Sequence, residues 1–262
     1  MGAISAIART TLGEAIRRKV LLIIMLIGIL FLSVIPAFSV LSAKSELTTM
    51  ISAMFFVLRY TSALIAIVLT VYMLPNEIER RTIYTILSKP VQRWQFLLGK
   101  YLGAIFALGL MIGMMSFLMI TMFYLFQHPE ASKMFELARQ ALLYFVEMSL
   151  LTAVAMFFST FVSPLVNFFI SIGLWLVGTL LNPLYESISK NNEMAPVLKS
   201  IFSFVFSLLP NFANYDTKNP IINPGQAIQN ETIYYLKITG YGFLYIGILL
   251  ILGILIFDRR EV

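Results

Sequence analysis

Long uninterrupted runs of apolar residues constrain this chain more than any other feature of its sequence. The runs at 20–41, 51–74 and 97–126 each reach or exceed the roughly 20 residues that a helix needs to cross a hydrocarbon core of about 30 Å. Over the whole chain, 59% of residues are hydrophobic, 12% are charged, and the mean hydropathy is +0.87. A soluble domain cannot bury so much apolar surface, so we expect an all-α membrane protein with one polytopic membrane domain over 1–262.

Six transmembrane spans are predicted from these runs and from three further ones. They are expected at 20–41, 51–74, 97–126, 138–162, 164–182 and 238–257. The first run is too long for the apolar region of a signal peptide, so this span is expected to stay in the protein.

Two further segments are predicted to be helical without forming ordinary spans. Apolar residues recur at helical spacing over 3–19, which indicates an amphipathic interfacial helix, with a plain juxtamembrane extension as the alternative. Segment 183–237 is expected on the outer side. Within it, Val197–Leu209 is too short to cross and is interpreted as a re-entrant or interfacial helix, and Asn211–Asn230 as an irregular loop.

The distribution of basic residues predicts the orientation. With six spans, one side of the membrane carries most of them: Arg9, Arg17, Arg18, Lys19, Arg80, Arg81, Lys89, Arg93, Lys100, Arg259 and Arg260. The short loops on the other side hold only Lys44, Lys133 and Arg139. Because short cytoplasmic loops carry an excess of Lys and Arg, both termini are expected in the cytoplasm.

Composition also excludes several classes of function. The chain has no cysteine, so disulfides, thiolate metal sites and cysteine nucleophiles are excluded. The net charge of +6 does not indicate nucleic-acid binding, because the basic residues flank apolar spans and form no stripe on a polar domain. Five methionines between Met111 and Met122 are interpreted as flexible apolar filler and not as a metal relay. No bound cofactor is expected.

A charged amphipathic segment at 76–96 separates the second span from the third. It opens with Glu77-Ile-Glu79-Arg80-Arg81-Thr82, turns at Ser88-Lys89-Pro90, and continues through Arg93 and Trp94. Trp94 is a suitable interfacial anchor. The pattern favours a structured cytosolic segment over the alternative, a solvated loop that only satisfies the positive-inside rule.

This segment resembles that of the permease subunits of type-two ABC exporters. The resemblance rests on residues 77–82, on Lys89-Pro90-Val-Gln-Arg93-Trp94 and on Leu98-Gly99-Lys100, with weaker matches near both ends of the chain. It implies a coupling helix that docks on a separate ATPase subunit. The implied coupling residues are Glu77, Glu79, Arg80, Arg81, Thr82, Lys89 and Arg93.

The resemblance implies further partners. ATP and Mg²⁺ would be held by the partner ATPase, since this chain has no Gly-x-x-x-x-Gly-Lys-Ser/Thr loop. A second permease copy, identical or related, would complete the pathway within the membrane lipid. A prokaryotic inner membrane and export as the direction of transport are implied in the same way.

Two charged residues lie inside apolar runs, Arg59 in the second span and Glu147 in the fourth. Each is about nine residues from the outer end of its span, which corresponds to a depth of about 13 Å. Charges within a membrane usually face a partner or a cavity. The similar depth makes a mutual pair possible. We expect Arg59 and Glu147 to pair across the two spans, as a static structural pair, or to line the outer part of the pathway.

Three other functions compete with the permease interpretation. A subunit that anchors or assembles a surface machine, such as a motility or pilus system, has the same sequence requirements. A secondary transporter is disfavoured because the sequence shows no inverted repeat and few intramembrane charges. An integral membrane enzyme is disfavoured because no catalytic constellation is present.

Overall fold

The structure is a computed structural model that describes residues 2–41, 47–75, 92–128, 130–190, 196–217 and 231–259. Every regular element in this part of the chain is helical, which confirms the expected all-α class. The α-helices are α1 (Ala3–Arg17), α2 (Lys19–Leu41), α3 (Leu47–Val71), α6 (Arg93–Gln127), α7 (Ala131–Ser159), α8 (Pro164–Thr179), α9 (Leu181–Lys190), α10 (Pro196–Leu208) and α11 (Glu231–Arg259), and η1 (Ala213–Tyr215) is a 3₁₀ turn.

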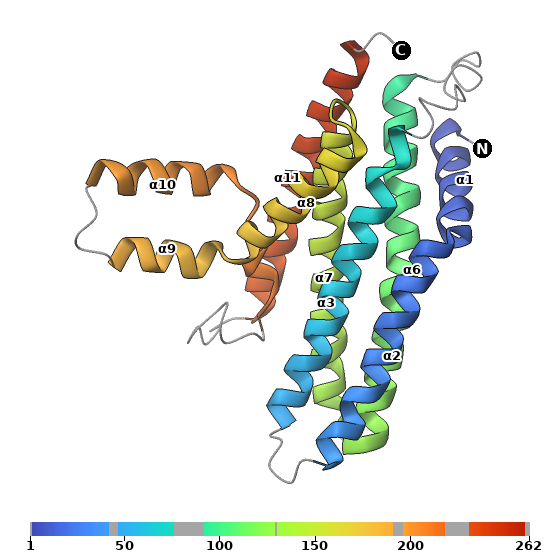
Figure 1. Ribbon diagram of the computed structural model, residues 1–262, viewed down its shortest axis with the longest axis vertical. Helices are drawn as coiled ribbons and strands as arrows, with labels where there is room; N and C mark the ends of the chain where they lie inside the picture. The colour runs from blue at the N-terminus through green and yellow to red at the C-terminus, as the bar shows by residue number, and fades with distance from the viewer. Residues whose placement is uncertain are drawn as a thin grey trace.

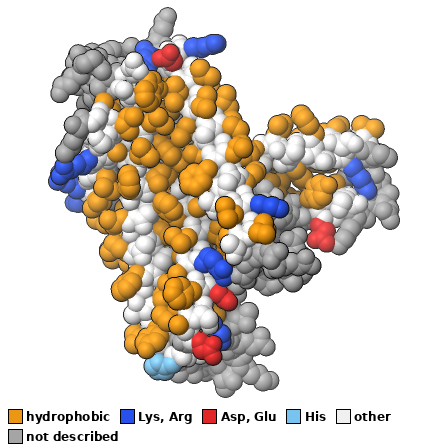
Figure 2. Space-filling view, turned by 180° about the vertical axis from the view of Figure 1, so that it is seen from behind, with side chains coloured by type: hydrophobic (Ala, Val, Ile, Leu, Met, Phe, Trp, Pro, Cys, Tyr) orange, Lys and Arg blue, Asp and Glu red, His pale blue; other side chains and the backbone are white. Residues whose placement is uncertain are grey.

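Long helices lie side by side in a bundle (Figure 1). Among the described residues, five helices are long and apolar enough to cross a membrane: α2, α3, α6, α7 and α11. The pair α8 and α9 passes the same test together but is bent by 54°, so the described chain has five or six candidate spans. Hydrophobic side chains are spread along the whole side of the bundle seen in Figure 2. This surface is the one that lipid would solvate.

Helix α7 lies at the centre of the bundle. It packs against α3, α6, α8 and α11, and its residues Glu147–Met156 are all buried. Helices α3 and α8 contact each other as well as α7, whereas α11 contacts α6 and α7. Helices α8 and α11 therefore both pack on α7, and α8 also contacts α3 whereas α11 also contacts α6.

The first helix, α1, packs along the N-terminal part of α6. Glycines on α6 make this close approach feasible: a Cβ at Gly103 would lie 2.5 Å from Thr11 Cβ and 2.6 Å from Ala8 O, and one at Gly99 would lie 2.8 Å from Ile7 Cβ. Gly99 and Gly103 thus allow close packing of two helices within the subunit. The interfacial position of α1 stays a prediction.

Helices α9 and α10 project sideways from the bundle as an antiparallel pair (Figure 1). Helix α10 falls where the sequence predicted a short helix at 197–209. A groove of about 610 Å³ lies between the two helices, lined by aromatic side chains, serines and Lys199. After α10 the chain returns to the bundle through residues 209–217.

Candidate functional site

The intramembrane charges Arg59 and Glu147 form an ion pair. Arg59 comes from α3 and Glu147 from α7, and their exposed fractions are 1% and 0%. The Nη2 of Arg59 lies 2.6 Å from Glu147 Oε1, and its Nε donates to both carboxylate oxygens at 3.1 and 2.9 Å. Two atoms of the guanidinium thus bind one carboxylate, which is the arrangement that arginine makes best.

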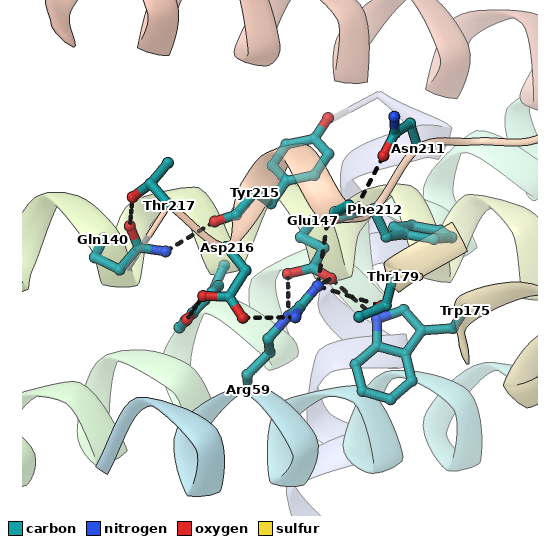
Figure 3. Close-up of polar contacts among 12 residues, drawn as sticks. Arg59, Gln140, Glu147, Trp175, Thr179, Asn211, Phe212, Tyr215, Asp216 and Thr217 are labelled. Carbon is teal, nitrogen blue, oxygen red and sulfur yellow. Dashed lines mark hydrogen bonds and ion pairs between the residues drawn. The ribbon is translucent and has the colours of Figure 1, made fainter. Parts of the chain in front are cut away.

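A second carboxylate comes from the segment after α10. Asp216 follows the turn η1, is 5% exposed, and accepts a hydrogen bond from Arg59 Nη1 at 2.8 Å. Figure 3 shows the guanidinium between the two acidic side chains. A residue from the predicted outer segment therefore reaches a charge in the second span.

Polar and aromatic neighbours complete this cluster. Trp175 Nε1 donates to Glu147 at 3.0 Å, and the Tyr144 hydroxyl donates to Asp216 at 3.0 Å. Arg59 Nη2 also donates to Thr179 Oγ1 and to the Phe212 carbonyl. Buried charges are tolerated only when their hydrogen-bonding capacity is used. We call these residues, Arg59, Tyr144, Glu147, Trp175, Thr179 and Asp216, the buried charge cluster.

The turn that carries Asp216 is fixed on its other side by Gln140. The Gln140 amide donates to the Tyr215 carbonyl at 2.8 Å, and Thr217 donates to Gln140 Oε1 at 2.5 Å. The Tyr215 hydroxyl donates to the Ile238 carbonyl of α11. Burial raises the pKa of Tyr215, and the Glu147 charge raises it further, so the hydroxyl keeps the proton that it donates.

Two glycines admit the aromatic residues of this segment. A Cβ at Gly178 of α8 would lie 2.5 Å from Phe212 Cδ2, and one at Gly242 of α11 would lie 2.6 Å from the Tyr215 hydroxyl oxygen. Any larger residue would meet the segment from either side. Residues 209–217 therefore occupy a space between α8 and α11 that glycines on both helices keep open.

Of the predicted coupling residues, only Arg93 belongs to the described part of the chain. Glu77, Glu79, Arg80, Arg81, Thr82 and Lys89 lie outside the described residues. Arg93, the first residue of α6, donates to the carbonyl oxygens of Phe257 and Asp258 at 2.9 and 3.3 Å and stacks over the Phe257 ring. It thus binds the C-terminal end of α11, where carbonyls have no partner within the helix.

Nearby contacts join α1 to the same end of α6. Lys100 Nζ lies 3.6 Å from Glu14 of α1, and the lysine side chain is buried over Phe96. Helices α1 and α11 are thus both attached to the first turns of α6, which directly follow the segment 76–91.

Several residues of the buried charge cluster were missed in the sequence. Asp216 falls in a stretch rich in Asn and Pro, which was interpreted as an irregular outer loop. The available signal in the sequence was the pair of aromatic residues near it, Phe212 and Tyr215. In the structure both are fully buried. Tyr144 and Trp175 carried no distinguishing signal, because aromatic residues are frequent throughout these spans.

Fold and buried charges together define a polytopic helical membrane protein with its charged residues paired inside the bundle. The sequence matches the model of the ABC-2 family transporter proteins over residues 5–262, so the chain belongs to this family. It is a membrane permease component of an ABC transporter. No curated protein matches the chain.

Proposed function

We propose that the chain is the permease of an ATP-driven exporter in a prokaryotic inner membrane, where two permease copies work with two separate ATPase subunits. The family match over 5–262 is the observation that carries this proposal. In this proposal the substrate pathway lies between the two permease copies, and alternating access moves the substrate outward. The many apolar and aromatic side chains favour an amphipathic or hydrophobic substrate.

Coupling to the ATPase would run through residues 76–100. The charged residues from Glu77 to Thr82 would make oriented contacts with the ATPase, which set the register of the two partners. The contacts of Arg93 and Lys100 support this route, because they attach α11 and α1 to the start of α6. A displacement of the segment would then move three helices together as a rigid body.

A pull-down tests the proposal. The tagged chain is isolated from its native membrane in mild detergent, and its partners are identified by mass spectrometry and assayed for ATP hydrolysis. We expect an ABC ATPase to co-purify. We expect Glu77→Ala and Arg81→Ala to reduce its recovery or activity by about tenfold, because oriented charged contacts at an interface contribute about 1.4 kcal/mol or more.

Lys133→Ala is the matched control, because this exposed charge is at the start of α7, on the predicted outer side. It should leave ATPase recovery unchanged. Recovery of a constant set of structural or other membrane proteins, without any ATPase, would contradict the permease proposal and support a subunit that anchors or assembles a surface machine.

A further inference from the structure

The segment 209–217 enters the bundle as irregular chain among long helices. Its residues Pro210, Phe212, Ala213, Tyr215 and Asp216 are all buried. Irregular backbone is tolerated at membrane depth only where it is buried in protein or lines a cavity. The segment fills the space between α8 and α11 and lies over α7. It therefore packs where α8 and α11 would otherwise face each other.

The charges are arranged so that the segment can leave without disrupting the spans. Glu147 accepts hydrogen bonds from both Nε and Nη2 of Arg59. The arginine therefore keeps this ion pair after Asp216 departs. Asp216 would return to water with its segment. The large cost of leaving a buried charge without a counter-ion therefore does not arise.

The contacts that hold the segment are also separable from the core. They include the ion pair and a hydrogen bond from Arg59 of α3, and hydrogen bonds with Gln140 and Tyr144 of α7. Tyr234, Tyr241 and the Ile238 carbonyl of α11 also hydrogen-bond to the segment, and Gly178 and Gly242 leave places open for Phe212 and Tyr215. Before it comes the α9–α10 pair, which projects away from the bundle (Figure 1). Movement of the segment thus requires no change in the packing of α3, α6 and α7 on one another.

We propose that residues 209–217 are a releasable plug that closes the outer side of the permease between α8 and α11, with the Arg59–Asp216 ion pair as its latch. This inference rests on the proposed function, since it assigns the plug to the outward-opening step of transport. Release of the plug exposes Arg59, Tyr144 and Glu147 to the outer solvent.

The absence of cysteine from the sequence makes the plug directly measurable. Ala213 is fully buried in η1, and Ala213→Cys adds one sulfur atom. Its reaction with a membrane-impermeant maleimide added from outside reports how often the plug is out, because labelling of a buried thiol follows the population of the open form. We expect slow labelling in the resting complex, and labelling about tenfold faster during ATP turnover and in Asp216→Asn.

Glycine substitutions provide a test that leaves every charge in place. Gly178→Ala and Gly242→Ala put a methyl group within 2.6 Å of the plug, so each should accelerate labelling of Ala213→Cys by about tenfold or more. The matched controls are Gly173→Ala on α8 and Gly247→Ala on α11, where a Cβ meets nothing within 4 Å. They should change the labelling rate less than about twofold.

The outcomes are decisive in both directions. A thiol at position 213 that stays unlabelled while the complex hydrolyses ATP and transports would overturn the plug. So would equal labelling in the Gly178→Ala and Gly173→Ala variants. If Ala213→Cys does not fold, hydrogen exchange of residues 209–217 in the otherwise unmodified chain makes the same comparison, and equal exchange in Gly178→Ala and Gly173→Ala has the same meaning.

Failure of the plug differs from failure of the proposed function. A complex that contains an active ATPase but never releases residues 209–217 contradicts only the plug. A chain that purifies without an ATPase contradicts the permease proposal and, because the plug rests on it, the plug's role in transport.

Discussion

At the scale of single residues, Arg59 has the most demanding environment in the described chain. One cation is shared by two carboxylates, and both of these accept further hydrogen bonds, from Trp175 and Tyr144. Glu147 is the indispensable partner, because it belongs to a neighbouring span and is fully buried. Asp216 is the conditional partner, because it belongs to a segment that comes from outside the spans.

This asymmetry predicts the result of exchanging the charges. Glu147→Ala leaves Arg59 with Asp216 as its one carboxylate partner and Trp175 Nε1 without its acceptor, so it should destabilise the fold by about 1–3 kcal/mol. The swap Arg59→Glu with Glu147→Arg should not restore stability, because Asp216 would then face the new carboxylate at position 59. Adding Asp216→Asn to the swap should restore part of it. Apparent melting temperatures in detergent check all three, and full rescue by the simple swap would show that Asp216 is not coupled to the pair.

The pairing of Arg59 with Glu147 was accessible from the sequence, whereas the third member was not. Both residues interrupt apolar runs at a similar depth, and intramembrane charges require partners. Asp216 has ordinary loop neighbours in the sequence. Its burial depends on glycines at 178 and 242, which are about 40 residues before and 25 residues after it and make room for the segment. No periodic pattern in the sequence links these distant positions, so the burial of Asp216 could not be predicted from it.

At the scale of helices, the contact of α1 with α6 depends on backbone proximity. Gly103→Ala would place its methyl group 2.5 Å from Thr11 Cβ and should destabilise the protein by about 1–3 kcal/mol through overpacking. The control is Gly113→Ala on the same helix, where a Cβ meets nothing within 4 Å. Alanine is the better helix former by about 1 kcal/mol, so this control should be neutral or stabilising. Equal melting temperatures of the two variants would contradict a close α1–α6 contact.

The helices themselves were predicted well, and their ends less well. Five of the six expected spans overlap a single long helix, because uninterrupted apolar runs of this length have few other solutions in lipid. The fifth differs most: the run 164–182 becomes α8 and then bends by 54° into α9. Asn182 and Pro183 lie just after the bend, and such a change in direction is set by tertiary contacts that apolar runs do not encode.

At the scale of the whole molecule, the described parts of both chain ends lie at the same end of the bundle (Figure 1). The predicted six spans are an even number of crossings, which would put both chain ends on one side of the membrane. Basic residues mark the same end: Arg9, Arg17 and Arg18 on or just after α1, Arg93 at the start of α6, and Arg259 at the end of α11. The positive-inside rule predicts that this end lies in the cytoplasm.

Single cysteines in the cysteine-free chain test this topology in intact cells. Ser132→Cys lies at the exposed start of α7 and should react with an impermeant maleimide at once. Ser5→Cys and Asp258→Cys, both exposed at the opposite end, should react only after the membrane is permeabilised. Labelling of Asp258→Cys but not Ser5→Cys in intact cells would mean an odd number of crossings. The bent pair would then enter and leave on the cytoplasmic side, and the contact of Arg93 with α11 could not form across the bilayer.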